Sequence, residues 1–526
     1  MQQLTAEDAS FLYLETPNAP MSGGYLNMYD PSTAPGGRVT FKGILAAVEA
    51  RLHLAPSFRQ RLVRVPMDLD HPYWVDDGDF DLEYHVRHIA LPHPGDWRQL
   101  CIQVARLLAR PLDMTRPLWE LYVIEGLDNI DWLPKGSYAT FLNSHHAAMD
   151  GMSGMDLVTA MHDLTCEAEP PAPERPWKPR SAPAPAELLA RAGMNNFLMP
   201  ARLVQLVTRT LPDVAKLQSQ LREGELAAPG GSAPRTRFNA TISAHRVIDG
   251  RHFPLEGLKQ IKNETKGATI NDAVLAIVGG ALRTYLGEHG ELPAEALQAM
   301  VPISVRTDDQ TGAGGNQVSA MVATLGTQIK DPLERLAAIR AATRESKALS
   351  SAVGARALAE YSRFMPGGLM IQGARLASQL GLANRTEPPY NTVVTNMPGP
   401  QVTLYSAGAR LVAMKGCGMI HDAMGLMHVV TSYCGTLAVT FVADREMMSD
   451  PAFYAECLQG AYDDLARAAG VDATGPPPPD PPRPSRPAAA KPTTAKPTTA
   501  KPTAGRTAAA RTSRRAPTRT NPIRGG

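Results

Sequence analysis

Residues 145–151 read His-His-Ala-Ala-Met-Asp-Gly, and this stretch decides the fold more than any other in the 526-residue chain. It follows residues 136–143, Gly-Ser-Tyr-Ala-Thr-Phe-Leu-Asn, whose aromatic and β-branched content predicts a strand. Apolar residues return at helical spacing over residues 152–164. We therefore expect the two histidines where a strand ends and a helix begins, a position at which rigid elements commonly present functional side chains.

The two histidines of this stretch are candidate proton acceptors. A neutral imidazole can take a proton from an alcohol near neutral pH, and a positioned base of this kind typically speeds a reaction by about 10² to 10⁴-fold. His145 or His146 could activate a hydroxyl for attack on a thioester and then return the proton to the departing thiolate. Asp150 could orient the imidazole or pair with an arginine, and Gly151 allows a tight turn.

Two simpler interpretations of the same residues stay open. His145 and His146 could be two hydrogen-bonded histidines in a turn that have a structural role and take no part in a reaction. His-His-Asp are also metal-ligand types, but adjacent residues rarely converge on one ion and no HExxH spacing is present. We therefore expect no metal site.

The charge of the chain is unevenly distributed. Hydrophobic residues make up 44% and charged residues 20%, which is typical of globular proteins, and the net charge is +2. Residues 476–526 contain three Lys, eight Arg and one Asp, so this tail carries +10 and the rest of the chain −8. Because the basic charge is local, we expect no nucleic-acid groove in the folded body. Residues 475–526 are rich in Pro, Ala and Thr and predict a disordered tail, either solubilising or weakly attracted to anionic lipid or nucleic acid.

The cysteines and the termini indicate a reducing compartment. The five cysteines are odd in number, widely spaced and without a CxxC motif, which argues against a disulfide framework and a structural zinc: Cys101, Cys166, Cys417, Cys434 and Cys457. The N-terminus has acids where a secretory signal would carry basic residues, and no run of 18 apolar residues occurs. We expect a cytoplasmic protein without a membrane span, for which contact with a membrane surface is still possible.

The pattern along the chain predicts four parts. Residues 1–166 and 236–470 each have mixed helix and strand patterns, so we expect an α/β fold of two comparable halves with a cleft between them. Residues 167–235 form a Pro-rich linker followed by connecting helices, and residues 475–526 form the tail. The expected elements are helices at 40–54, 96–112, 152–164, 269–286 and 451–469, and strands at 118–124, 136–143, 299–305, 318–325, 392–395, 428–433 and 436–442.

The connecting segment allows two interpretations. Residues 188–221 are helix-like, and we expect Pro200 and Pro212 to break them. Apolar residues alternate there with Arg191, Arg202 and Arg209. The simpler interpretation is a helix pair packed on the body, and the other is a surface that touches lipid.

Several further motifs narrow the family. In addition to HHxxxDG, the chain contains, in this order, LTAEDASFLYLETPNAPM (4–21), RPLWE (116–120), Asn271-Asp272, VPISVR (301–306), NMPGP (396–400) and SYCG (432–435). Together they resemble the bacterial wax ester synthase/acyl-CoA:diacylglycerol acyltransferase family, within the CoA-dependent acyltransferase superfamily. The resemblance covers roughly residues 4–470, and its motifs are specific as a set although the short ones are weak singly.

The resemblance implies two similar chloramphenicol-acetyltransferase-like α/β domains with an active-site tunnel between them. It implies His146 as general base, His145 as its support and Asp150 as mainly structural. We expect Asp150 to pair with Arg306. Asn271 has either a role beside the reacting carbonyl or that of an ordinary helix cap.

The remaining motif residues are expected to be structural. Thr269 and Asp272 fit a capping pattern, and Gly151 allows the turn after the motif. Pro117, Leu118 and Trp119 form the family's PLW motif, which we interpret as packing support for the strand beside the active-site strand.

The resemblance also implies the reaction. The leading expectation is acyl transfer from acyl-CoA to diacylglycerol, with acyl-CoA as co-substrate and no other cofactor. The alternatives are wax ester synthesis from a long-chain alcohol, a condensation on a carrier-bound acyl group, and a catalytically weak lipid-binding protein. Because such acceptors are insoluble, we expect a peripheral contact with the inner membrane face or a lipid droplet, through residues 188–209 or 352–382, and no specific nucleic-acid partner.

Overall fold

Two six-stranded sheets organise the part of the chain that the structure describes. The first has the strand order β12-β13-β2-β7-β6-β5. Its strands are β12 (Tyr405–Ser406), β13 (Ala409–Cys417), β2 (Ser22–Asp30), β7 (Tyr138–His145), β6 (Trp119–Glu125) and β5 (Val86–Ala90). β7 is buried along its whole length and ends at His145, so the histidine motif begins where this inner strand ends.

The computed structural model describes residues 1–148, 154–168, 176–222, 232–304, 318–353, 373, 376, 378 and 380–472. All of them belong to one compact unit, residues 1–479, which is separate from residues 480–526. The predicted disordered tail, 475–526, lies outside the described residues. None of the described helices is long and apolar enough to cross a membrane.

The inner strands of the first sheet fix the position of the motif. β7 runs antiparallel to both neighbours. Ser22 of β2 lies opposite His145, and Trp119 of β6 lies opposite Ser144. Because the register of a strand decides which face each side chain occupies, this pairing determines which way the histidines point.

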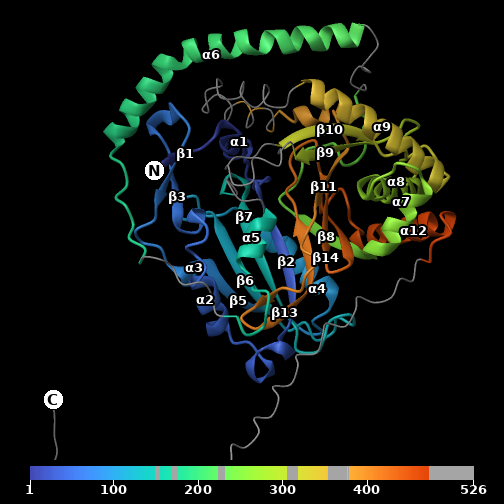
Figure 1. Cartoon of the computed structure of the whole chain (residues 1–526), viewed down its shortest axis with the longest axis horizontal. Helices are drawn as coiled ribbons and strands as arrows, with labels where there is room; N and C mark the ends of the chain where they lie inside the picture. Colours follow the sequence, from blue (N-terminus) through green and yellow to red (C-terminus); the bar gives the residue numbers. More distant parts are fainter. Residues whose placement is uncertain are drawn as a thin grey trace, which may run out of the picture. The chain divides into compact units, whose positions relative to one another are not determined.

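β13 joins the first sheet from far away in the sequence. It pairs antiparallel with β2 from Arg410–Asp30 to Cys417–Gly24, with an irregularity between Leu411 and Ala413. The sheets therefore do not follow the order of the chain, because residues 405–417 leave the second half to extend the first sheet (Figure 1). The division into domains at 166 and 236 stays a prediction.

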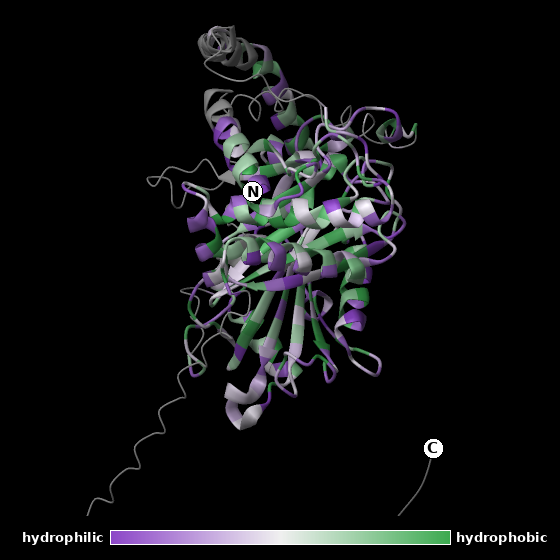
Figure 2. Ribbon diagram, turned by 90° about the vertical axis from the view of Figure 1, so that its right-hand side faces the viewer, coloured by the Kyte–Doolittle hydropathy of each residue, from purple (hydrophilic) through white to green (hydrophobic). Residues whose placement is uncertain are grey.

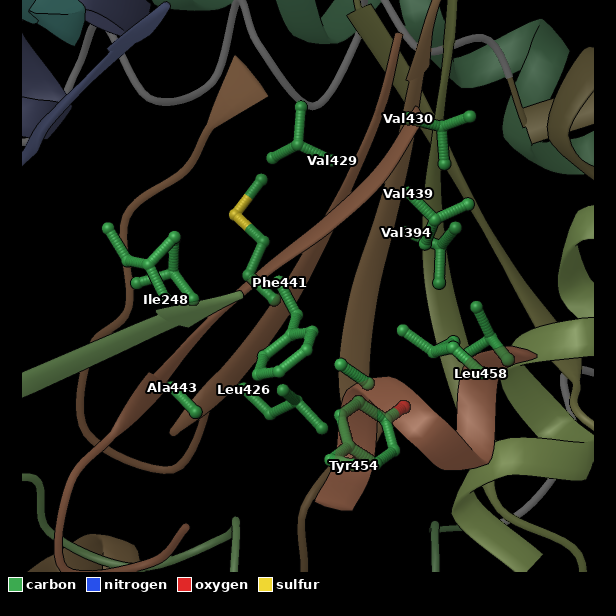
Figure 3. Close-up of a cluster of buried hydrophobic side chains, with 14 of the residues drawn as sticks. Ile248, Val394, Leu426, Val429, Val430, Val439, Phe441, Ala443, Tyr454 and Leu458 are labelled. Atoms are coloured by element: carbon green, nitrogen blue, oxygen red, sulfur yellow. The ribbon is translucent and has the colours of Figure 1, made fainter. Parts of the chain in front are cut away.

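The second sheet has the order β10-β9-β11-β14-β15-β8. Its strands are β10 (Val318–Thr324), β9 (Gln298–Ser304), β11 (Thr392–Met397), β14 (Leu426–Tyr433), β15 (Thr436–Asp444) and β8 (Arg246–Pro254). Val429 and Val439 are among the buried side chains of its central strands, and Tyr454 and Leu458 of helix α12 (Pro451–Ala468) belong to the same cluster (Figure 3). Figure 2 shows green, apolar residues along strands inside the molecule and purple, hydrophilic residues on outer helices and loops.

The other elements surround the two large sheets (Figure 1). A small sheet, β1-β4-β3, joins Gln2–Gln3, Tyr73–Asp76 and Gln60–Val63. The helices not yet named are α1 (Ala6–Leu14), α2 (Phe41–Glu49), α3 (Leu82–His85), α4 (Trp97–Leu108), α5 (Gly154–Ala160), α6 (Pro185–Arg222), α7 (Leu255–Glu264), α8 (Ile270–Glu288) and α9 (Pro332–Val353). The mixed α/β class with two sheet-rich halves is confirmed.

Most predicted elements are confirmed with small shifts at their ends. The strand predicted at 318–325 is β10, that at 436–442 is β15, and the helix predicted at 269–286 is α8. Three helices end earlier than predicted: α2 at Glu49 instead of residue 54, α4 at Leu108 instead of residue 112, and α5 at Ala160 instead of residue 164.

The predicted break of the connecting helices is wrong. α6 runs without interruption through Pro200 and Pro212 and is drawn as one long curved helix in Figure 1. A proline removes one backbone hydrogen bond and tends to bend a helix, but in an element of 38 residues the remaining bonds can continue on both sides.

Candidate active site

The backbone of the two motif histidines is held from both sides. His145, the last residue of β7, donates its N–H to the carbonyl of Leu118 over 3.0 Å. His146 begins the short 3-10 turn η5 (His146–Ala148) and donates its N–H to the carbonyl of Met21 over 2.9 Å. The two side chains therefore leave the chain in fixed directions at the end of the strand.

His145 is fully buried, and its tautomer follows from its contacts. The N–H of Ala147 donates to Nδ1 of His145 over 3.1 Å, so Nδ1 has no proton and the neutral ring carries it on Nε2. Nε2 lies 3.4 Å from Oε2 of Glu15. The two atoms are not aligned as a hydrogen bond, so the contact is electrostatic.

Helix α1 supplies a contact to each histidine. Its first turn is capped by the hydroxyl of Thr5, which accepts from the N–H of Asp8, and its last turn is followed directly by Glu15. The ring of Phe11 stacks on the imidazole of His146 with centroids 4.9 Å apart and an interplanar angle of 29°. A single helix thus places an aromatic ring on one histidine and a carboxylate at the other.

His146 is kept uncharged at neutral pH. Burial of its ring, together with the neighbouring His145, lowers the pKa of His146 from 6.5 to about 4. A neutral imidazole has one nitrogen free to accept a proton. The electrostatic environment therefore maintains His146 in the protonation state that a general base needs.

The start of β2 lies close to Nε2 of His146. A Cβ placed on Gly23 would lie 3.8 Å from Nε2 of His146 and 2.8 Å from the carbonyl oxygen of Cys417. Nε2 therefore lies near the start of β2. Glycine at position 23 keeps this approach free of a side chain.

The PLW motif holds the start of β6 against the end of β7. Pro117 and Leu118 are buried, and the Leu118 carbonyl accepts both the N–H of His145 and the hydroxyl of Ser144, the latter over 3.3 Å. Trp119 stacks on His85 at 4.6 Å, and its Nε1 donates to the carbonyl of Phe58 over 3.0 Å. The structure thus places Leu118 and Trp119 in positions that support the active-site strand.

The Asn-Asp pair lies at the first turn of α8, where the two residues differ. Asp272 is buried and accepts from the N–H of Thr269 and from the hydroxyl of Thr343, each over 2.7 Å. It forms the capping box predicted for this helix. Asn271 is partly exposed, and within the described residues no hydrogen bond or ion pair joins its side chain to His145 or His146. A role for Asn271 beside the reacting carbonyl stays a prediction.

Three predicted site residues lie outside the described residues: Asp150, Gly151 and Arg306. The expected pairing of the Asp150 and Arg306 side chains therefore stays a prediction.

Polar anchors fix the segment that follows the motif. Arg51 is buried and places Nη2 2.6 and 2.5 Å from the two carboxylate oxygens of Asp163. His162 donates from Nδ1 to the carbonyl of Val158 over 2.6 Å, so its Nε2 accepts the hydroxyl proton of Tyr29 over 2.8 Å. These contacts hold the end of α5 against the first sheet.

The two C-terminal motifs come close to α5. The N–H of Gly399, in NMPGP, donates to the hydroxyl of Ser432, in SYCG, over 3.1 Å. A Cβ on Gly399 would lie 3.4 Å from the sulfur of Met155 on α5. Motifs more than 200 residues apart in the sequence are thus adjacent around the helix that follows the histidines.

Sequence reasoning missed three residues of this site: Phe11, Glu15 and Gly23. The helical pattern of 4–14 and the Thr5–Asp8 cap could have located α1, but no sequence spacing links Glu15 to a histidine 130 residues later. In the described part of the chain, no group of three or more His, Cys, Asp or Glu side chains could hold a metal ion, and the five cysteines are free.

Comparison with known families gives two matches along the chain. Residues 4–274 match the wax ester synthase/diacylglycerol acyltransferase catalytic domain, and residues 314–466 match the WS/DGAT C-terminal domain. Two relatives of Mycobacterium tuberculosis, each named "Putative diacyglycerol O-acyltransferase", are 35% and 34% identical. The alignments cover 86% and 88% of this chain and 87% and 99% of those proteins.

Solved structures agree with the sequence matches. The wax ester synthase/diacylglycerol acyltransferase from Marinobacter aquaeolei VT8 superposes with a TM-score of 0.62 and 26% identity, covering 89% of this chain and 100% of that one. The first condensation domain of the calcium-dependent antibiotic synthetase gives a TM-score of 0.52 at 15% identity, with 90% and 97% covered. At that identity the likeness shows the fold alone.

Proposed function

The chain belongs to the wax ester synthase/diacylglycerol acyltransferase family, and we propose that it transfers a long-chain acyl group from acyl-CoA to the hydroxyl of diacylglycerol. The observation that carries this proposal is the state of His146. Its imidazole lies at the end of β7, is uncharged at neutral pH, and has Nε2 close to Gly23, which carries no side chain. A base in this state and setting suits the removal of a proton from an alcohol.

The proposed reaction needs one base and no covalent enzyme intermediate. Nε2 of His146 takes the proton of the acceptor hydroxyl as its oxygen attacks the thioester carbonyl. The tetrahedral intermediate then collapses, the carbon–sulfur bond breaks, and the imidazolium gives its proton to the CoA thiolate. The products are an ester and free CoA, and His146 returns to its neutral form.

The positive charge that develops on His146 must be stabilised during this step. His145 is adjacent, and its Nε2 lies 3.4 Å from Oε2 of Glu15. That carboxylate supplies negative charge next to the histidine pair. We assign His145 and Glu15 positioning roles and His146 the catalytic role.

The choice of diacylglycerol rests on the relatives. Two mycobacterial relatives at 34–35% identity bear the name of diacylglycerol O-acyltransferases. A wax ester synthase activity on long-chain alcohols is the second candidate, because the Marinobacter structure is described as both enzymes in one. Both acceptors present a hydroxyl on an apolar molecule, so the same base serves either reaction.

We further propose that a patch on α6 and the turn after β3 contacts the lipid surface that holds the acceptor. Met67 and Phe197 are 80% and 81% exposed, and Met194 is 62% exposed. The amide of Asn196 donates to the carbonyl of Leu69 over 3.0 Å and joins the two segments. Exposed flexible and aromatic apolar side chains on adjacent elements suit insertion between lipids. The second predicted segment, 352–382, lies mostly outside the described residues.

Labelled acyl transfer tests the function directly. The full chain is supplied with radiolabelled oleoyl-CoA and either dioleoylglycerol, hexadecanol or no acceptor. Labelled triacylglycerol above the no-acceptor background supports the leading proposal, and wax ester formed in preference to triacylglycerol would support the second. Release of free CoA without ester, or no turnover with either acceptor, would contradict both.

Lipid contact is tested separately. Met67→Ser/Phe197→Ser should bind liposomes of phosphatidylglycerol and diacylglycerol more weakly than the wild type. Val402→Ser, at an exposed apolar side chain outside both segments expected to contact lipid, is the matched control. Equal co-sedimentation of all three proteins would contradict this part of the proposal.

A further inference from the structure

A cavity of about 220 Å³ lies where β13 meets the face of the second sheet. On one side it is lined by residues 412–414 of β13, and on the other by Thr431, Ala438 and His252. Thr431 lies opposite Ala438, and Ala438 lies opposite His252, so these side chains share one face of the sheet. The register of β13 against β2 shifts at Val412, and an extra residue of this kind bends a strand locally. The cavity lies at this bend, between the two large sheets.

This cavity is separate from the proposed catalytic centre. Met414 is the last residue of β13 that lines it. Two residues further along, a Cβ on Gly416 would lie only 2.3 Å from Val429, so the two sheets are in close contact there. β13 reaches the start of β2, near His146, only at Cys417. Packed side chains therefore lie between the cavity and the histidine motif.

The exposed end of the cavity is at Trp132. This side chain, in the loop between β6 and β7, lines the cavity and is 44% exposed. The rest of the wall is mainly apolar, and two hydroxyls in it are already used: Thr431 donates to the carbonyl of Met414, and Tyr433 to that of Leu411. Sites for drug-sized ligands are typically about 300–1,000 Å³. The smaller volume here suits a single short aliphatic chain and excludes a two-chain lipid.

One polar atom of the wall has no partner. Nε2 of His252 is buried and forms no hydrogen bond with any described residue. The ring of Trp132 packs edge-on against this imidazole, with centroids 5.1 Å apart and an interplanar angle of 79°. A buried polar atom without a partner costs free energy, which a ligand oxygen would recover. His252 is therefore the point at which the polar end of a ligand would bind.

The electrostatic surroundings of His252 are positive. Burial lowers the pKa of His252 well below its usual value, and the charges of Lys415 and Arg251 lower it further. Lys415 is buried with a pKa of about 8, so it is charged at pH 7, and its ammonium lies 5.0 Å from the ring centroid of Trp97. The carboxylate that acts most strongly on Lys415 is Asp249, which also pairs with Arg251 at 3.5 Å. Asp249 thus balances one of two cations, and the remaining positive charge favours an anion near His252.

We propose that this cavity binds the anion of an aliphatic carboxylic acid, with the carboxylate at His252 and the chain between β13 and β14. A neutral imidazole can carry its proton on Nε2 and donate it to a carboxylate oxygen. Lys415 and Arg251 supply the charge complementarity, and the apolar wall covers the chain. Binding is non-covalent, and the site does not depend on the proposed acyl transfer at His146.

Calorimetry on the full chain tests the proposal with octanoate and 1-octanol, which share a chain length and differ in charge. Because hydrogen bonds to a charged group are stronger than neutral ones, we expect octanoate to bind at least about tenfold more tightly than octanol. His252→Phe and Lys415→Met should each remove most of this preference and leave the Kd for octanol within about twofold. Equal Kd ratios in the wild type and both variants, or no binding of octanoate by the wild type, would overturn the inference.

Two further variants control for folding and for position. His88→Phe, at an exposed histidine on the edge strand β5 of the first sheet, should match the wild type. Thermal unfolding identifies any variant that has lost its structure. If His252→Phe or Lys415→Met does not fold, Trp132→Ala decides, because its side chain is in an exposed loop. It should weaken the binding of both probes, and an unchanged Kd for octanoate would overturn the inference.

Competition separates this site from the proposed acyl-transfer site. Octanoyl-CoA carries the same chain as a thioester and has no free carboxylate, so we expect it to leave the Kd for octanoate unchanged. Displacement of octanoate by octanoyl-CoA would place the acid in the acyl-donor site. That result would overturn this inference and leave the proposed function intact, whereas octanoate binding in a chain without transferase activity would support the inference alone.

Discussion

Oε2 of Glu15 lies 3.4 Å from Nε2 of His145, and this contact joins the end of α1 to the fully buried histidine of the motif. The tautomer of His145 is set on its other side, where Nδ1 accepts from the Ala147 N–H. Glu15 therefore faces the protonated nitrogen of the His145 ring. The contact with Glu15 and the hydrogen bond from Ala147 together fix the orientation of that ring. The contact places negative charge next to the two histidines. One of them, His146, becomes positive in the proposed reaction.

Removing that charge should slow turnover without abolishing it. Glu15→Gln keeps the shape of the side chain, and we expect kcat to fall on the order of 10-fold with KM for acyl-CoA unchanged, a part of the 10² to 10⁴-fold that a positioned base provides. Steady-state kinetics measures both constants. Glu49→Gln, at an exposed glutamate at the end of α2, should match the wild type. If both variants keep full kcat, Glu15 has no positioning role.

The pH dependence of the rate should reflect the lowered pKa of His146. The pKa of His146 is lowered to about 4, so the neutral base persists from pH 7 down to about 5 and is lost as the pH falls through 4. In short assays we expect kcat/KM to stay level between pH 7 and 5.5. An unperturbed histidine would halve the rate near pH 6.5. A midpoint near 6.5 with fully folded protein would contradict the lowered pKa of His146.

The aromatic contact on His146 should contribute to that shift. Phe11 stacks on the imidazole and helps to exclude water from it. We expect Phe11→Ala to raise the pKa of His146 toward 6.5, because solvation favours the charged form, and to move the acid limb of the rate profile upward. Leu14→Ala, at an exposed position of the same helix, is the control. An unmoved limb in Phe11→Ala would mean that other groups bury the ring.

Stability should decrease on acidification before the carboxylates titrate. Burial lowers the pKa of His162 to about 4 and that of His428 to about 3, each from 6.5. As the pH falls below about 6.5, these histidines are therefore protonated in the unfolded chain but stay neutral in the folded chain. Each such histidine lowers the free energy of unfolding by about 1.4 kcal/mol per pH unit between 6.5 and its folded pKa. Urea denaturation at pH 7.5 and 5.5 measures the change, and a higher midpoint at pH 5.5 would be the opposite sign.

The two residues at the start of α8 should separate stability from chemistry. Asp272 accepts from Thr269 and Thr343 in a buried setting, so Asp272→Ala should destabilise the protein by about 1–3 kcal/mol. Asn271→Ala should leave the urea midpoint within error, because its side chain is partly exposed. Equal midpoints for wild type and Asp272→Ala would show that the capping box contributes nothing measurable.

Local patterns predicted much of the fold. The capping pattern at Thr269 located α8 to within two residues, and the turn at Gly435 located the hairpin of β14 and β15. β13 could not be predicted as a strand of the first sheet, since its partner β2 lies nearly 400 residues earlier and no local pattern encodes that pairing. The continuity of α6 was missed because the effect of an interior proline depends on the helix around it.

Only the residues of the candidate site that form a recognisable sequence motif were predicted. His145 and His146 were found because two imidazoles before Asp-Gly are unusual side chains in a recognisable order. Glu15, Phe11 and Gly23 are ordinary residues whose importance arises only when α1 and β2 fold onto the end of β7. The difference between Asn271 and Asp272 likewise needed the position of Thr343, 71 residues further along.

The central claim is that His146 removes the proton of the acceptor, and one pair of measurements on one variant tests it most directly. His146→Ala is assayed for labelled ester formed from oleoyl-CoA and diacylglycerol, and its Kd for oleoyl-CoA is measured by calorimetry. The account predicts that turnover falls by about 10² to 10⁴-fold while the Kd stays within about twofold of the wild type. Full turnover in His146→Ala with normal acyl-CoA binding would contradict it.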